Sequence, residues 1–168
     1  ALNERLPEVG EADSGGAAEF EENTLYTGPG LEGGGRVLRL RRVGSRAILT
    51  YKQRGSSTSA IKRQLEEETE VKDPEALAAI LEALGYRPAL VYEKRRATWR
   101  VGGAEVVLDE LPFGLFAEIE GEEGEILAAE KLLRLEAVEA VHETYPDLTA
   151  RHGARIGAAL EARFSKGG

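Results

Sequence analysis

The sequence predicts an α+β fold in which helices pack on one face of a many-stranded antiparallel sheet. Several segments alternate charged and apolar residues with a period of two, as strands with one buried face do. Short turn signals, Val43-Gly44-Ser45 and Gly102-Gly103, join consecutive segments of this kind. Two other stretches, after Asp73 and around Ile126, carry apolar residues at helical spacing.

The first strands are expected before residue 30. Residues 1–18 are weakly patterned, with a short strand at Leu2–Leu6 and a poor helix at Glu8–Ala12. Glu19–Tyr26 is a stronger strand prediction, because the turn residues Gly28-Pro29-Gly30 close it.

A hairpin is predicted over Leu38–Lys52, and the charged face of the sheet is clearest there. Arg39 and Arg41 alternate with leucines, so one face is cationic and the other is apolar. The return strand adds Lys52 to the charged face. A flexible loop is expected to follow at Gly55–Ser59.

Ile61–Val71 is predicted as a strand, although its acidic run has helical propensity. The reason is a helix start just beyond it, where Asp73 is suited to the cap and Pro74 to the first helical position. The helix that follows, Glu75–Leu84, has one apolar stripe and ends at Gly85.

Three further strands are expected over Arg87–Val101, Ala104–Glu110 and Leu115–Gly121. On the first of them, Lys94 and Arg96 share a face, and the apolar residues lie opposite.

The remaining chain is predicted to be helical. Helices are expected over Glu125–Leu135 and Ala137–Val141, with a break at Tyr145–Leu148. A terminal helix is expected over Thr149–Phe164, within a C-terminal tail of residues 149–168. A length of 168 residues with no linker suits a single domain over residues 1–168.

Composition narrows the classes of partner. The chain has no Cys, which excludes disulfides, thiolate metal ligands and a Cys nucleophile and fits a cytoplasmic protein. No apolar run approaches the roughly 20 residues that span a bilayer. The net charge of −8 argues against nucleic acid or an anionic membrane as a partner.

One face of the predicted strands collects charges of both signs. Its cations and acids are Arg39, Arg41, Lys52, Lys62, Lys94, Arg96 and Arg100, and Glu66, Glu68, Glu70, Glu105, Asp109, Glu118 and Glu120. Patterning alone leaves two options open, a salt-bridged surface in water and a barrel with a charged interior. Carboxylates suit Mg²⁺ or Mn²⁺, and Arg and Lys suit polyphosphate oxygens. Together they favour a substrate that arrives as a metal–polyphosphate complex.

Ordered motifs from Glu19 to Leu148 resemble the CYTH superfamily, which includes class IV adenylate cyclases, thiamine triphosphatases and inorganic tripolyphosphatases. The motifs include Asn23-Thr24-Leu25-Tyr26, Leu38-Arg39-Leu40-Arg41, Leu49-Thr50-Tyr51-Lys52, Glu93-Lys94-Arg95-Arg96 and Glu118-Ile119-Glu120-Gly121. The resemblance implies a closed antiparallel β-barrel of about eight strands, a triphosphate tunnel, with helices packed on the outside.

The resemblance also implies site residues. Substrate-binding positions match Arg39, Arg41, Lys52, Lys94 and Arg96, and catalytic ones match Lys52, Glu68, Lys94 and Asp109. Glu118 and Glu120 match a metal-binding pair, to which Glu4 is a possible addition. The N-terminal Glu-x-Glu-x-Lys element of the family is only partly present, because Leu2 and Leu6 flank Glu4.

The implied activity is metal-dependent, with Mg²⁺ or Mn²⁺ as cofactor, on a small triphosphate. The leading expectation is hydrolysis of tripolyphosphate, thiamine triphosphate or a nucleoside triphosphate such as ATP. Two alternatives stay open: a class IV adenylate cyclase that forms cyclic AMP and pyrophosphate, and a catalytically inert polyphosphate- or nucleotide-binding protein. A homodimer is also compatible with the resemblance.

Overall fold

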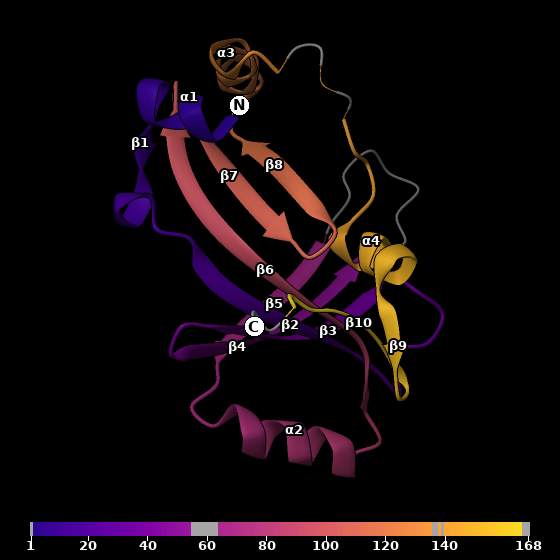
Figure 1. The fold of residues 1–168 in the computed structure, drawn as a ribbon. Coiled ribbons are helices and arrows are strands. Elements are labelled where there is room, and N and C mark those ends of the chain that lie inside the picture. Colours follow the sequence, from indigo (N-terminus) through magenta and orange to yellow (C-terminus); the bar gives the residue numbers. More distant parts are fainter. Residues whose placement is uncertain (1, 55–63, 136–137, 139, 166–168) are drawn as a thin grey trace. The chain divides into compact units, whose positions relative to one another are not determined.

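The computed structural model describes residues 2–54, 64–135, 138 and 140–165 (Figure 1). The expected loop Gly55–Ser59, Lys62 and part of the expected helix Ala137–Val141 lie outside these residues. The chain forms two compact units. Unit 1 comprises residues 1–20 and 94–144, and unit 2 comprises residues 21–93 and 145–168. None of the helices in the described ranges is long and apolar enough to cross a membrane.

The described strands form one ten-stranded sheet in the order β5-β4-β3-β2-β6-β10-β9, with β1 and β7 also paired to β6, and β8 to β7. The strands are β1 (Glu11–Ala12), β2 (Glu19–Thr27), β3 (Arg36–Val43), β4 (Arg46–Arg54), β5 (Gln64–Glu70), β6 (Arg87–Val101), β7 (Ala104–Leu111), β8 (Gly114–Glu120), β9 (Ala154–Ile156) and β10 (Ala159–Ala162). The helices are α1 (Leu2–Val9), η1 (Asp13–Gly16, a 3₁₀ turn), α2 (Pro74–Ala83), α3 (Glu123–Leu133) and α4 (Tyr145–His152).

This arrangement confirms the predicted fold class, an antiparallel sheet with helices packed on it. Within the described ranges no strand pairing joins β5 to β8, so hydrogen bonds do not close the sheet into a ring. The strands predicted between Glu19 and Gly121 all form, with ends that differ by a few residues at most.

Unit 2 is built on β2–β5, with α2 packed on their apolar face. Tyr26, Leu40, Ala47 and Leu81 form the buried core between this face and the helix. Figure 1 shows α2 beneath these strands. The predicted start of α2 is confirmed, because the backbone N–H of Ala76 donates to Asp73 Oδ1 at 2.9 Å. The charged face of β3 and β4 therefore points away from α2.

Unit 1 has its own core, where α1 and α3 lie together at the ends of β7 and β8 (Figure 1). Leu6 and Val101 are fully buried there. The expected strand at Leu2–Leu6 and the expected helix over Glu8–Ala12 are both wrong, because the helix is α1 and β1 follows it. Helical spacing puts Leu2, Leu6 and Val9 on one apolar stripe against the core, whereas a strand would have put Glu4 between the leucines.

The C-terminal prediction is also wrong. The expected break at Tyr145–Leu148 is the start of α4, and the expected helix over Thr149–Phe164 is replaced after His152 by β9 and β10. Gly153 follows α4 at a position that only glycine fits, because a Cβ there would lie 2.6 Å from the carbonyl oxygen of Thr149. β10 instead pairs in parallel with β6, with Leu160 opposite Leu90, a tertiary contact that overrides helical propensity.

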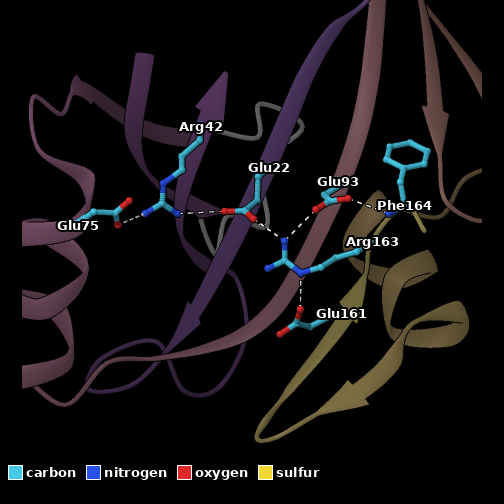
Figure 2. A network of polar contacts seen from close by, with 7 residues as sticks. All are labelled: Glu22, Arg42, Glu75, Glu93, Glu161, Arg163 and Phe164. Carbon is cyan, nitrogen blue, oxygen red and sulfur yellow. Dashed lines mark hydrogen bonds and ion pairs between the residues drawn. The ribbon is translucent and has the colours of Figure 1, made fainter. Parts of the chain in front are cut away.

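A charge network fixes this C-terminal strand within unit 2 (Figure 2). The guanidinium of Arg163, just after β10, donates to carboxylates from two other strands and to its neighbour, namely Glu22, Glu93 and Glu161. Burial alone would lower the pKa of Arg163, but these hydrogen bonds raise it above its ordinary value. Arg163 therefore stays charged and links β2, β6 and β10.

The same network continues to α2. Arg42 donates to Glu22 at 3.1 Å and to Glu75 at 2.7 Å, and the backbone N–H of Phe164 donates to Glu93 at 2.8 Å. Glu22 and Arg42 lie on the face of β2 and β3 that also carries the apolar core, so the network is separate from the face of Arg39 and Arg41.

Candidate functional site

The cationic face of unit 2 is built by the register of three strands. Arg39 on β3 lies directly opposite Thr50 on β4, which lies opposite Glu68 on β5. Side chains that are directly opposite point to the same face of a sheet. Arg41, two residues after Arg39 on β3, points to that face as well, and so does Lys52, two residues after Thr50 on β4. The face predicted from alternation in the sequence is therefore present.

Glu68 lies at the centre of this face. The hydroxyl of Thr50, which is fully buried, donates to Glu68 Oε2 at 2.8 Å. The Nη2 atoms of Arg39 and Arg41 lie 3.9 and 3.8 Å from the same oxygen, too far for a hydrogen bond. Lys52 has a separate partner, with its Nζ 2.9 Å from Glu66 Oε1. Thr50 is not among the site residues predicted from the sequence, because its role depends on the cross-strand register.

The two arginines on this face have unsatisfied donors. In the described part of the chain, neither Arg39 Nε nor Arg41 Nε has a hydrogen-bond acceptor, although both atoms are buried. A buried donor without an acceptor is costly, and a charged one more so. An anion that brings several oxygens to this face would remove that cost.

Unit 1 carries a second charged cluster, centred on Asp109 of β7. This carboxylate is fully buried. Arg96 Nε donates to Asp109 Oδ1 at 2.8 Å, and Arg96 Nη2 donates both to Asp109 Oδ2 and, at 2.9 Å, to Glu118 Oε2. Lys94 Nζ lies 3.4 Å from Asp109 Oδ2 and is buried as well. The structure therefore brings together four of the predicted site residues here.

The acidic end of this face lies on β8. Glu118 and Glu120 share one face of the strand, and Glu105 of β7 lies directly opposite Glu120. Across the described residues, no three acidic or histidine side chains are grouped to hold a metal ion. Glu4, on the exposed side of α1, thus forms no such group with Glu118 and Glu120.

The donor chemistry of the Glu118–Glu120 pair still suits Mg²⁺ or Mn²⁺. Mg²⁺ keeps several waters in proteins and takes one or two carboxylates together with substrate phosphates. Two carboxylates on one strand fit that mode, and one of them is already held in place by Arg96. They do not fit a fully protein-built cage of three or more ligands.

A pocket of about 440 Å³ lies in unit 1 on the opposite face of β6 and β7. Its lining comprises Leu6, Gly16, Ala18, Arg95, Ala97, Trp99, Leu108, Glu110 and Leu115. The one cation in this lining, Arg95, lies 3.1 Å from Glu110. Mostly apolar walls and a paired cation do not suit a highly charged anion, so the charged faces are the better candidates.

Known proteins place this fold and these residues in a family. The family model of the CYTH domain matches residues 8–151. No curated protein matches the chain.

Solved structures share the fold. A candidate adenylate cyclase from Vibrio parahaemolyticus superposes with a TM-score of 0.68 at 20% identity, covering 89% of this chain and 90% of that one. A protein from Pyrococcus horikoshii is 28% identical, with a TM-score of 0.66 and coverage of 89% and 92%.

A candidate adenylyl cyclase from Hippeastrum, described as having a dominant triphosphatase activity, has a TM-score of 0.59 at 19% identity, with coverage of 86% and 85%. Identities this low show likeness of fold alone. The family model, in contrast, spans most of the sequence, including both charged clusters. The chain belongs to the CYTH domain family.

Proposed function

We propose that this CYTH protein is a metal-dependent enzyme that hydrolyses a triphosphate: tripolyphosphate, thiamine triphosphate or a nucleoside triphosphate. The observation that carries the proposal is the pair of buried, unsatisfied Nε donors of Arg39 and Arg41, on one face with Lys52. Triphosphate oxygens are the acceptors that such a face lacks. Family membership and the triphosphatase activity described for the Hippeastrum protein support the choice.

The cations have the role of binding and charge neutralisation. In unit 2, Arg39, Arg41 and Lys52 bind phosphate oxygens and stabilise the charge that spreads over them in the transition state. Thr50 fixes the Glu68 carboxylate beside the arginines, where Glu68 is suited to orient an attacking water.

In unit 1, Lys94 and Arg96 are the corresponding phosphate ligands. Asp109 holds both of them, and its full burial between two cations supports a positioning role for this carboxylate. That Asp109 is itself a catalytic residue stays a prediction.

Glu118 and Glu120 are the proposed ligands of Mg²⁺ or Mn²⁺. Such an ion, when bound, neutralises charge on the phosphate oxygens. The chain's own contribution is to hold the two carboxylates on one strand face, with Arg96 fixing the position of Glu118.

The likeness of fold to a candidate adenylate cyclase favours a second function, cyclisation of ATP. In that reaction the ribose 3′-hydroxyl attacks the α-phosphorus, a new P–O bond forms, and pyrophosphate leaves with the electron pair of the broken bond. The same cations would serve both reactions, which differ in the phosphorus atom that meets the nucleophile.

The test is incubation of the full chain with tripolyphosphate, thiamine triphosphate and ATP, each with and without Mg²⁺ or Mn²⁺. Phosphate and cyclic AMP are measured separately. We expect metal-dependent phosphate release from at least one substrate, whereas cyclic AMP with pyrophosphate would identify the cyclase instead. Calorimetric binding of a triphosphate without any product would establish the inert binding protein and contradict the enzyme proposal.

A further inference from the structure

Asn23 is a polar residue of β2 that the proposed mechanism does not use. It is only 1% exposed, and within the described ranges its Nδ2 atom has no hydrogen-bond acceptor. Asn23 lies directly opposite Arg41 on β3, so both side chains point to the same face of the sheet. Arg41 Nε is itself buried without an acceptor.

Two neighbouring buried donors thus lack an acceptor among the residues that the structure describes. An apolar side chain at position 23 would fill the space without burying a carboxamide, so a merely structural position does not need Asn. The residues that follow in the same cross-strand row do not supply an acceptor to Asn23 either. Arg41 lies opposite Ile48 on β4, and Ile48 lies opposite Glu70 on β5, so Glu70 is three strands away from Asn23. The missing acceptor is therefore best supplied by a ligand.

We propose that Asn23 is a substrate-positioning residue whose carboxamide donates to the same phosphate group as Arg41. This inference rests on the proposed triphosphate site and extends it from β3 and β4 to β2. The Asn23 carboxamide contributes a hydrogen-bond donor that carries no charge, on a planar group of fixed geometry. It therefore orients a phosphate that the arginines attract.

The test variant is Asn23→Asp, which is nearly isosteric and replaces the Nδ2 donor by an oxygen. That oxygen would accept from Arg41 and would repel a phosphate. Glu21, which is buried two residues earlier on the same face, is present in both proteins and so does not contribute to the difference between them. We expect the affinity for tripolyphosphate, measured by calorimetry without metal, to fall about tenfold or more, because a hydrogen bond to a charged group is lost.

The matched control is Thr24→Val. Thr24 is the next residue on β2, is also buried, and points to the other face. This variant should bind tripolyphosphate as the wild type does. The melting temperature of each unliganded variant is measured as well, and Asn23→Asp should not lower it. If Asn23→Asp does not fold, Asn23→Ala takes its place and should also lose affinity, because it removes the donor.

Two failures can be told apart. If the wild type binds tripolyphosphate and Asn23→Asp binds it equally well, or if Thr24→Val loses as much affinity, the role of Asn23 is wrong and the proposed function stands. If the wild type binds none of tripolyphosphate, thiamine triphosphate and ATP, with or without Mg²⁺, the proposed function itself is wrong, and the role of Asn23 falls with it. If it binds one of the other two instead of tripolyphosphate, the same comparison of variants is made with that triphosphate.

Discussion

The two charged clusters of the protein differ in how well their cations are satisfied. In unit 1, Arg96 makes a short two-point contact with the fully buried Asp109 and a further hydrogen bond to Glu118. In unit 2, Arg39 and Arg41 reach only to 3.9 and 3.8 Å from Glu68 and keep buried donors without an acceptor. The cations of the first cluster already have protein partners, whereas the second cluster keeps donors that a bound anion would satisfy. The two clusters should therefore respond differently to mutation.

The largest expected effect is loss of stability when the first cluster is broken. Asp109→Ala leaves Lys94 and Arg96 without their shared carboxylate, and we expect the free energy of unfolding to fall by about 3–5 kcal/mol. Denaturant unfolding measures it. The matched control is Glu110→Ala on the same strand, where the ion pair to Arg95 is exposed and should be worth about 1 kcal/mol or less. Equal losses in both variants would contradict the comparison.

The acidic end of unit 1 is expected to matter for activity rather than stability. Glu118→Gln keeps the shape of the side chain and a hydrogen-bond acceptor for Arg96 but loses a charged metal ligand. We expect kcat with Mg²⁺ to fall about 100-fold, as for loss of one electrostatic stabiliser of a transition state. The control is Glu67→Gln, on the opposite face of β5 from Glu66 and Glu68. Retained activity in Glu118→Gln would remove this residue from the mechanism.

The second cluster should lose affinity without losing stability. Arg39→Lys keeps the charge but removes the guanidinium fork and its buried Nε. We expect the affinity for tripolyphosphate to fall about tenfold, while the melting temperature of the unliganded protein stays the same or rises. Arg36→Lys, on the other face of β3, is the control and should change neither quantity. A marked drop in melting temperature for Arg39→Lys would mean that Arg39 is already satisfied in the free protein.

The smallest effect concerns the apolar face of unit 2. Burial raises the pKa of Tyr26 above 10. A raised folded pKa favours the protonated phenol, so this contribution to stability is fully present below the unfolded pKa of about 10 and is lost as pH rises through the folded value. Tyr26→Phe should therefore flatten the fall in unfolding free energy as the pH rises above about 10. An unchanged slope would show that Tyr26 does not titrate on unfolding.

Sequence alternation could predict the faces of the strands but not their contacts. The period of two placed Arg39, Arg41 and Lys52 on one face, and the structure confirms that placement. The donor from Thr50 to Glu68 and the burial of Asp109 depend on register and depth, which a single strand pattern does not contain.

Long-range contacts explain the predictions that were wrong. β10 is a strand because it pairs with β6, and Arg163 meets Glu22 across 141 positions in the sequence. The helix α1 was missed because Leu2 and Leu6, four residues apart, share a face in a helix and in a strand alike, and only the core of unit 1 decides between the two. The single-domain organisation, the cytoplasmic location and the homodimer stay predictions.

Whether Arg39 and Arg41 bind a polyphosphate is measured by calorimetric titration of tripolyphosphate, without metal, into the wild type and into the double variant Arg39→Ala/Arg41→Ala. The unsatisfied donors of the two arginines predict that the wild type binds the anion and that the double variant loses at least about 100-fold in affinity, since each arginine is expected to contribute about tenfold or more. Equal affinity in both proteins, or no binding by the wild type, would contradict the account.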